Sequence, residues 1–384
     1  MKILYITPLL PESYLEQVLE VNPSQYVFAP QKFHRNLVEG FMVNGHDVQV
    51  LSVLPSFVDY KKCFVEKGIK YSFIPYTNKP VLKHFQVATG VFKKIRHDKS
   101  FVPDIVICDT LNASMCLGAL ATKKKKGAKI VGIVTDLPDS VSKYEKGLIY
   151  RASSYFSSKY INSFDYYVLL TEQMNSVVNS KNRPYIIMEG VCDIPQNINK
   201  DVRQGHTEVK RKLLYAGGRP SKDGVEMLIT AFKQIPGNDL ELNVYGSMPN
   251  VSVGKDTEDP RIVYYGKTDN SIIAEEERRS YLLVNPRPTG EEYTKYSFPS
   301  KVMEYMATGT PMVTTKLAGI PEEYFQYVYI FENCTTECYL TVLKEILSQD
   351  RVTHFAKGQS AQSFVLNNKN KIVQTKRIIE LFGE

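Results

Sequence analysis

Hydrophobic residues along the chain fall into two kinds of segment that alternate. Short runs rich in Val, Ile, Leu and Tyr, such as Lys2–Thr7, indicate strands that are buried on both faces. Longer segments carry apolar residues about one helical turn apart, as in Lys32–Asn44, where Phe33, Leu37 and Phe41 share one face. Such alternation predicts an α/β fold in which a parallel sheet is covered by helices on both faces.

The alternation runs through the chain twice, separated by a polar stretch without period over residues 192–210. The first series of predicted strands comprises Lys2–Thr7, Asp47–Val53, Pro103–Cys108, Lys129–Val134 and Tyr166–Leu170. The second comprises Arg211–Ala216, Leu240–Tyr245, Ile262–Tyr265, Tyr281–Asn285, Pro311–Thr315 and Val328–Phe331, with helices at Gly224–Gln234, Ser271–Arg279, Phe298–Thr308, Glu337–Ser348 and Lys369–Phe382. We therefore predict two doubly wound, Rossmann-like domains, 1–195 and 196–384, and leave open whether the last helix returns to the first domain.

Composition narrows the class of protein. The 384 residues are 43% hydrophobic and 23% charged, which excludes collagen-like, disordered and disulfide-scaffold chains. The sequence has no apolar stretch near the roughly 18 residues of a membrane helix, and its start lacks the tripartite form of a secretory signal, so we expect a cytoplasmic protein. The six cysteines have no zinc-like spacing and are expected to be reduced thiols.

The excess of positive over negative charge is confined to the first half of the chain. Of the formal net charge of +7, residues 1–195 contribute all, with 24 Lys and Arg against 17 Asp and Glu, whereas residues 196–384 have 24 of each. The excess concentrates in two regions: Lys61, Lys62, Lys67, Lys70, Lys83, Lys93, Lys94, Arg96 and Lys99, and then Lys123–Lys126. A basic face predicts an anionic partner, such as a membrane surface or a phosphorylated substrate. Nucleic acid is not expected, because the chain has no recognisable nucleic-acid-binding module.

The run from Val81 to Arg96 mixes cations with apolar residues at helical spacing. One interpretation is an amphipathic helix on anionic lipid headgroups, at the inner face of a membrane. The other is a surface helix whose apolar side belongs to the core. For Lys123–Lys126 we favour a helix end, where cations complement the carbonyl end of the helix dipole.

The stretch Asn285–Thr314 contains the most informative chemistry. A strand is predicted to end at Asn285, and a helix to begin near Ser297 after a polar loop. On that helix Ser297, Lys301 and Glu304 share a face. A helix N-terminus with an added cation suits a diphosphate, and the carboxylate of Glu304 suits the hydroxyls of a ribose. The simpler alternative is a surface pair between Lys301 and Glu304, worth about 0.2–0.5 kcal/mol.

The segment SFPSKVMEYMATGTPMV resembles the nucleotide-sugar motif of glycosyltransferases with the GT-B fold, in particular glycosyltransferase family 4. LLYAGGRPSKDGVEMLITAF (Leu213–Phe232) resembles the family's strand, glycine pair, cations and helix. The resemblance implies that Arg219 and Lys222 clamp the leaving diphosphate. Gly217 and Gly218 would let the backbone approach the ligand. It also implies two domains facing an interdomain cleft.

The chain departs from the family pattern at one position. The family places two Glu residues eight positions apart, and Glu304 matches the second, which grips the ribose. Tyr296 stands at the first position, where it can donate a hydrogen bond to the donor sugar but supplies no carboxylate. Glu291 and Glu292 are nearby candidates for that role. After the strand Pro311–Thr315, backbone amides near Gly319 are a further donor contact, with a plain turn as the equal alternative.

Weaker candidates lie in the first half. Asp136 and Asp139 follow the strand Lys129–Val134, and by resemblance Asp136 is the favoured catalytic member, whereas Asp139 suits a helix cap. The glycine-free segment from Pro8 to Arg35 resembles an acceptor loop, and Lys32, His34 and Arg35 are candidates for contacting an acceptor phosphate. For His34, a core or surface histidine is the favoured alternative.

Together these features predict a hexosyltransferase-type glycosyltransferase. By resemblance it moves a sugar from a nucleoside diphosphate, with UDP the expected nucleotide, to a glycan or lipid-linked oligosaccharide of capsule type, with retention of configuration. No Asp-x-Asp motif occurs, so no cofactor is expected and catalysis is expected to be metal-independent. Two alternatives stay open: a catalytically silent GT-B partner or glycan-binding subunit, favoured by Tyr296, and a nucleotide-sugar epimerase.

Overall fold

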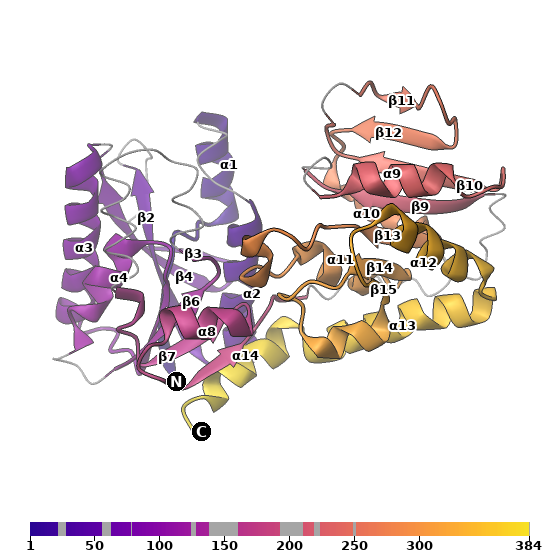
Figure 1. The fold of residues 1–384 in the computed structure, drawn as a ribbon. Helices are drawn as coiled ribbons and strands as arrows, with labels where there is room; N and C mark the ends of the chain where they lie inside the picture. Colours follow the sequence, from indigo (N-terminus) through magenta and orange to yellow (C-terminus); the bar gives the residue numbers. More distant parts are fainter. Residues whose placement is uncertain are drawn as a thin grey trace. The chain divides into compact units, whose positions relative to one another are not determined.

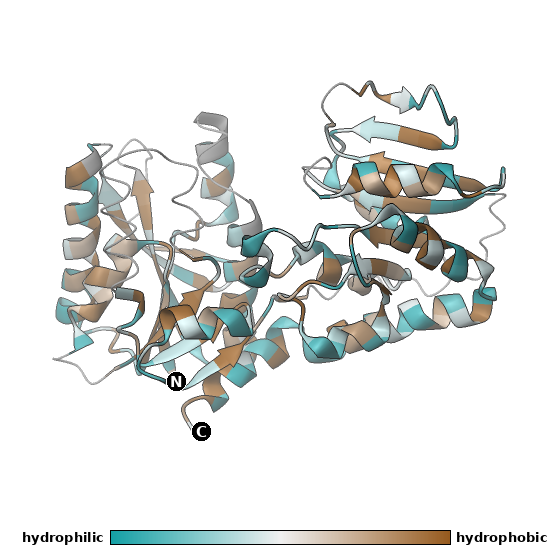
Figure 2. Ribbon diagram, in the orientation of Figure 1, coloured by the Kyte–Doolittle hydropathy of each residue, from teal (hydrophilic) through white to brown (hydrophobic). Residues whose placement is uncertain are grey.

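The computed structural model describes residues 1–21, 28–55, 63–77, 79–123, 128–137, 160–192, 210–218, 223–248 and 251–383. The chain divides into two compact units (Figure 1). The first unit consists of Met1–Val191 together with Lys371–Glu384, and the second consists of Cys192–Asn370. Hydrophobic residues concentrate on the strands of both units (Figure 2).

Among the described residues, eight strands form the sheet of the first unit, in the order β3-β4-β2-β1-β5-β6-β7-β8. The strands are β1 (Lys2–Ile6), β2 (Asp47–Pro55), β3 (Cys63–Glu66), β4 (Ile69–Tyr76), β5 (Ile105–Asp109), β6 (Lys129–Val134), β7 (Tyr166–Leu169) and β8 (Tyr185–Ile187). All neighbours pair in parallel except β3, which runs antiparallel to β4. The order reverses between β1 and β5, as in other doubly wound folds.

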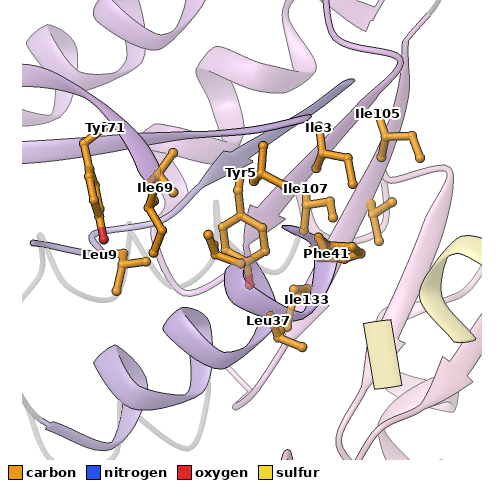
Figure 3. Packing of buried hydrophobic residues seen from close by; sticks show 14 of the residues in the cluster. Ile3, Tyr5, Leu9, Leu37, Phe41, Ile69, Tyr71, Ile105, Ile107 and Ile133 are labelled. Atoms are coloured by element: carbon orange, nitrogen blue, oxygen red, sulfur yellow. The ribbon is translucent and has the colours of Figure 1, made fainter. Parts of the chain in front are cut away.

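The helices of the first unit include the chain's last one. Within the described residues they are α1 (Glu12–Val21), α2 (Phe28–Val43), α3 (Pro80–His97), α4 (Ala113–Leu120), α8 (Glu172–Val178) and α14 (Lys371–Glu380). α14 packs on α2 at Gly40, where a Cβ would lie 2.4 Å from the carbonyl oxygen of Lys371. Asn44 then donates a hydrogen bond of 2.9 Å to the carbonyl of Ile372. The core beside them gathers Tyr5, Leu37 and Phe41 with isoleucines of the central strands (Figure 3).

One prediction for the first unit is wrong, and three of its strands were missed. The segment from Pro8 to Arg35 is not one long loop, because α1 occupies Glu12–Val21 and α2 begins at Phe28 rather than at Lys32. The lack of glycine in this segment did not distinguish the two, because helices also disfavour glycine. The strands β3, β4 and β8 were not predicted, because Lys70 and Ser72 interrupt the apolar pattern of β4, and β3 and β8 span only four and three residues and pair with a neighbouring strand.

The second unit has a seven-stranded sheet in its described part, in the order β11-β12-β10-β9-β13-β14-β15. Its strands are β9 (Arg211–Ala216), β10 (Leu240–Tyr245), β11 (Gly254–Lys255), β12 (Ile262–Gly266), β13 (Leu282–Asn285), β14 (Met312–Thr315) and β15 (Tyr329–Phe331). From β12 to β15 the strands are parallel and follow the dinucleotide-binding order 3-2-1-4-5-6. The α/β fold with two Rossmann-like halves is thus as the sequence predicts.

Helices cover both faces of this sheet. They are α9 (Val225–Lys233), α10 (Asn270–Arg279), α11 (Ser300–Thr308), α12 (Thr336–Ser348) and α13 (Arg351–Asn368). Alternate residues of β9 enter two different cores: Leu213 and Tyr215 pack with α9 and α12, whereas Leu214 and Ala216 pack with α11 and α13. None of the described helices combines the length and the hydrophobicity that crossing a lipid bilayer requires.

Helix boundaries in the second unit differ from the prediction at two places. α11 begins at Ser300, after Pro299 at the N-cap, so Ser297 does not cap it; Gly309, with φ of 72°, ends it as expected. The predicted helix Lys369–Phe382 begins two residues later, at Lys371, and the helix α13 before it was not predicted. The first three buried positions of α13 hold a histidine, a glycine and an alanine, and large apolar residues, Phe364 and Val365, are buried only near its end, so the pattern by which such helices are recognised is incomplete.

Gly118 tests the packing of α3 on α4. A Cβ at this position would lie 2.5 Å from the carbonyl oxygen of Ala88 and 2.6 Å from Cβ of Val91. We expect Gly118→Ala to lower the free energy of unfolding of the first unit by about 1–2 kcal/mol, since overpacking outweighs the gain in helix propensity. Urea unfolding followed by circular dichroism measures the change. Gly290→Ala, where no atom lies within 4 Å of the new Cβ, is the control; equal effects of the two would contradict the packing argument.

Candidate functional site

The candidate site of the second unit lies at the carboxyl ends of β9 and β13, where the strand order reverses. Parallel sheets bind ligands at such points because the loops after the two strands diverge there. Gly217 and Gly218 follow β9, and Pro286 and Arg287 follow β13. The N-terminus of α11 approaches the same edge, held by a side chain of its second turn.

That side chain is Tyr305, which fastens α11 to the end of β9. Its buried hydroxyl accepts a hydrogen bond of 3.0 Å from the backbone N–H of Ala216 and donates one of 3.3 Å to the carbonyl of the same residue. A second close approach fixes α9: Gly224, with φ of 80°, lies where a Cβ would be 2.2 Å from the carbonyl oxygen of Pro286. The loops after β9 and β13 are therefore in direct contact.

Lys301 lies at the centre of this edge. Its Nζ is 3.0 Å from Oδ2 of Asp223 and 3.3 Å from the hydroxyl of Tyr215, and the Tyr215 hydroxyl donates a hydrogen bond of 2.7 Å to the same Asp223 oxygen. The ammonium lies directly against the backbone of Gly217, where a Cβ would be 2.2 Å from Nζ. Gly217 is thus required so that the cation can lie against the backbone that follows β9.

Burial and charge act in opposite directions on this pair. Burial lowers the pKa of Lys301, while the charge and the hydrogen bond of Asp223 work to raise it. Burial works to raise the pKa of Asp223, but Lys301 and the hydrogen bonds from Tyr215 and Lys301 outweigh it and hold that pKa below its usual value. Asp223 is therefore ionised at neutral pH, and it neutralises part of the positive charge of the site. The sequence analysis did not identify Asp223. The feature that could have indicated it is its position directly before Gly224, at the start of a helix.

Arg287 is the second cation of this edge and was also missed. Its guanidinium lies 5.2 Å from the ring centroid of Tyr293, and its Nε is buried without a hydrogen-bond partner. Its charge contributes to lowering the pKa of both Lys301 and Asp223, so the three side chains are neighbours. A buried N–H without a partner is costly and therefore favours an anionic or carbonyl ligand at this position. The loop holding Arg287 is fastened by Cys334, whose Sγ accepts from the N–H of Thr289 at 3.3 Å.

Two carboxylates lie close to each other, one on α11 and one on the neighbouring helix α10. Glu304 is exposed one turn after Lys301, as predicted. Glu277 on α10 is buried, and this burial, together with the charge of Glu304, raises its pKa to about 7. Glu277 is therefore half protonated near neutral pH, and its proton is linked to the charge state of the residue expected to hold the ribose.

The other predicted donor residues have mixed placements. Gly218 faces open space, and the carbonyl oxygens of Ser297 and Thr294 would lie 2.5 and 2.6 Å from a Cβ at Gly319. The close packing of these two loops is enough to explain why a glycine stands at position 319, which agrees with the plain-turn alternative. Tyr296 ends a short 3-10 helix over Glu292–Lys295 and is half-buried. Arg219 and Lys222 lie outside the described residues.

The first-unit candidates do not gather into one exposed site. Asp136 follows β6 and accepts a hydrogen bond of 2.9 Å from the backbone N–H of Leu137, whereas Asp139 lies outside the described residues. Lys32 is exposed in the second turn of α2, not at its start. Arg35 donates to the carbonyl of Leu10 at 2.7 Å and to the hydroxyl of Tyr71 at 3.3 Å, which are structural contacts.

His34 is a core residue and not an exposed phosphate ligand. It is 3% exposed, with Nδ1 at 2.8 Å from the hydroxyl of Tyr5 and Nε2 at 3.5 Å from Oδ2 of Asp109. Burial, and then the charge of Asp109, raise the pKa of Tyr5. Both ring nitrogens are engaged, so the interpretation of His34 as a direct acceptor contact is wrong and the core alternative is correct. In the described parts of both units, no group of three or more His, Cys, Asp or Glu is arranged to hold a metal ion.

Comparisons with known proteins agree on the architecture. Residues 210–347 match the family described as Glycosyl transferases group 1. Sucrose-phosphate synthase from Thermosynechococcus elongatus is similar with a TM-score of 0.65 at 14% identity, covering 100% of this chain and 98% of that one. HepE from Anabaena in complex with UDP has a TM-score of 0.60 at 12% identity, covering 100% of both chains. The lipopolysaccharide outer core galactosyltransferase WaaB has a TM-score of 0.62 at 13% identity, covering 100% of this chain and 99% of that one.

At such low identities these structures show a shared fold, which is the two-domain GT-B fold. No curated protein sequence matches the chain.

The ion pair between Asp223 and Lys301 can be tested through stability. Asp223→Ala leaves the ammonium half-buried without its counter-ion, so we expect the second unit to lose about 1–3 kcal/mol of unfolding free energy. Because the pKa of Asp223 is lowered in the folded state, this contribution is present at neutral pH and disappears as the pH falls below the usual value of 3.8. Urea titrations at several pH values measure it. Asp269→Asn, at an exposed N-cap position without a capping hydrogen bond, is the control.

Glu277 predicts a second pH dependence with the opposite sign. Its pKa is raised from 4.5 to about 7, so the unfolded chain loses this proton at a lower pH than the folded one. The wild type should lose roughly 3 kcal/mol relative to Glu277→Gln as the pH rises through that interval. Melting temperatures at pH 5 and pH 8 would measure the difference, with Glu276→Gln as the neighbouring control. Parallel curves for wild type and Glu277→Gln would refute it.

Proposed function

We propose that this protein is a glycosyltransferase that binds a nucleoside diphosphate sugar, UDP-linked, in its second unit. One observation carries the proposal: Lys301 and Arg287 lie within electrostatic reach of each other at the carboxyl edge where the strand order reverses, within the segment that matches the group 1 glycosyltransferases. The carboxylate of Asp223 compensates only one of the two cations. A diphosphate, which has more than one negative charge, suits the positive charge that remains. HepE, whose structures contain UDP and UDP-glucose, shares the fold.

The proposed pose follows from the residues on this edge. The diphosphate lies against Gly217 and the first N–H groups of α11, where Lys301, Arg287, Arg219 and Lys222 supply charge. Gly218, whose Cβ position is open, leaves space for the ligand. Ribose hydroxyls bind Glu304, one turn further along the helix. Tyr296, Ser297 and the backbone near Gly319 lie toward the donor sugar.

The chemistry needs stabilisation of charge more than a protein nucleophile. The bond between the anomeric carbon and the diphosphate breaks, and the electron pair remains on the leaving oxygen, where the cations stabilise it. The acceptor hydroxyl attacks the same face, which retains the configuration, and its proton passes to the leaving diphosphate. Asp136 is proposed to contact sugar hydroxyls. We propose that this hexosyl transfer proceeds without a metal ion, on a glycan or lipid-linked oligosaccharide of a capsule-type polysaccharide, at the cytoplasmic side of a membrane.

Nucleotide binding is tested with two variants of the proposed site. Lys222→Ala should weaken UDP binding by about tenfold to a hundredfold, because a charge-assisted phosphate contact contributes roughly 1.5–3 kcal/mol. Glu304→Ala should mainly raise the KM for the donor, through the lost ribose contact. Calorimetric titration with UDP and initial rates measure these effects. Lys344→Ala and Glu345→Ala, exposed on α12, are matched controls. Wild-type UDP affinity in Lys222→Ala would overturn the assignment of that residue.

The products formed from UDP-sugars separate the alternative functions. A screen of nucleotide sugars by thermal shift identifies the donor, because a bound donor stabilises the folded chain. The proposed enzyme then gives UDP together with a glycosylated acceptor. UDP and an isomerised sugar without any acceptor would indicate an epimerase. Binding without turnover, with any donor and acceptor tried, would indicate a silent partner, the alternative that the missing carboxylate at Tyr296 favours.

A further inference from the structure

Helix α3 has two apolar stripes, of which the inner one belongs to the core. Val87, Val91 and Ile95 are buried against β4 and α4. Gly90 allows the close approach to β4, since a Cβ there would lie 2.5 Å from Cγ2 of Ile74. For these residues the core interpretation of the Val81–Arg96 run is correct.

The outer stripe faces solvent. Leu82, Phe85, Thr89, Phe92 and Arg96 follow one another at spacings of three and four, which places them on one face of the helix. Leu82 and Phe85 are 42% and 66% exposed, and Val81 beside them is 75% exposed. Single exposed apolar residues are ordinary, whereas three within two turns form a patch that marks an interaction site. We call Val81, Leu82 and Phe85 the α3 patch.

Cations surround the α3 patch without acidic residues among them. The helix contains Lys83, Lys93, Lys94 and Arg96 but no Asp or Glu, and Lys79 stands at its N-cap. The acid that follows, Asp98, is engaged by Lys94 at 2.7 Å, and this pair lies at the far end from the patch. No side chain caps the N-terminus, and the first turn has no acidic residue, so the partial positive charge of the helix dipole adds to the cations.

The side chains near the patch explain how these cations are presented. Nζ of Lys83 lies 4.6 Å from the ring centroid of Tyr76, which orients it beside the patch. Burial, and then the charge of Lys83, lower the pKa of His84, whose Nδ1 lies 2.6 Å from the hydroxyl of Ser114. His84 is therefore neutral and turned toward α4, so Lys79 and Lys83 supply the charge at this end.

We propose that the outer face of α3 docks on an anionic lipid bilayer. Val81, Leu82 and Phe85 enter the boundary between headgroups and acyl chains, while Lys79, Lys83, Lys93 and Arg96 contact lipid phosphates. The first unit as a whole has 27 Lys and Arg against 18 Asp and Glu, a net charge of +9, whereas the second has 21 against 23, a net charge of −2. Long-range attraction to an anionic surface thus acts on the unit that contains the patch.

Two other occupants fit these residues less well. A second copy of this chain would bring the same cations against each other, at an energetic cost that grows as water is excluded. A nucleic acid would satisfy the cations but leave Val81 and Leu82 without an apolar partner, because backbone contacts are made by charged and polar groups. A bilayer surface offers anions and apolar chains side by side. The inference does not depend on the transferase activity, since binding to vesicles is measured without donor or acceptor.

Co-sedimentation with vesicles tests the charge and the patch separately. The wild-type protein should bind vesicles of phosphatidylcholine with about one third phosphatidylglycerol at least tenfold more strongly than phosphatidylcholine alone, and raised salt should weaken this binding. We expect Leu82→Ser combined with Phe85→Ser to lower the partition coefficient about tenfold or more. Lys79→Glu combined with Lys83→Glu should lower it similarly. Val352→Ser, at an 81% exposed valine of the second unit, should leave it unchanged.

A fluorescent reporter locates the contact. The chain contains no tryptophan, so Phe85→Trp introduces a single indole at the patch. Its emission should shift to the blue with anionic vesicles, whereas that of Val352→Trp should not. Equal binding to both vesicle types, or binding without a blue shift of Phe85→Trp, would overturn the proposal. So would sedimentation velocity in the absence of lipid that shows an oligomer dissolved by the Leu82→Ser, Phe85→Ser variant, because the patch would then be an interface between copies.

Discussion

Parallel sheets covered on both faces limit where polar chemistry can occur in this protein. In β9, alternate residues enter two separate cores, so neither face of the sheet is available to a ligand. Backbone groups within the sheet are paired with neighbouring strands, whereas those beyond the strand ends are open to side chains and ligands. Lys301, Asp223 and Arg287 therefore meet at the carboxyl edge, and the helices around them serve to hold that edge in place.

The two units differ in how the charged groups at this edge are compensated, as far as the described residues go. In the second unit the half-buried ammonium of Lys301 and the hydroxyl of Tyr215 both contact the carboxylate of Asp223. The Nε of the nearby Arg287 is buried without a hydrogen-bond partner. At the matching edge of the first unit, Tyr5, His34 and Asp109 satisfy one another in the core. Charge that is only partly compensated favours an anionic ligand, while a completed network favours rigidity.

The two units also differ in their outer surfaces. α3 uses one apolar stripe to pack on β4 and α4 and exposes a second, surrounded by cations. A protein that handles a lipid-linked acceptor would gain from such a surface, because docking raises the local concentration of the acceptor. The proposed nucleotide site and the proposed docking face thus involve different units and different chemistry, and they can be disabled independently.

From the residues alone, the fold class followed, together with the strand β9 and the helix α11 that border the proposed nucleotide site, since most residues of strands such as β6 and β9 are apolar and Gly309 ends α11 by its own backbone preference. Local pattern did not reveal α13, whose first three buried positions hold His354, Gly358 and Ala361, or the burial of His34. Nor did it pair Asp223 with Lys301, which are 78 residues apart. Periodicity and turn chemistry act between near neighbours, whereas ion pairs, burial and exposed faces arise only when distant segments come together.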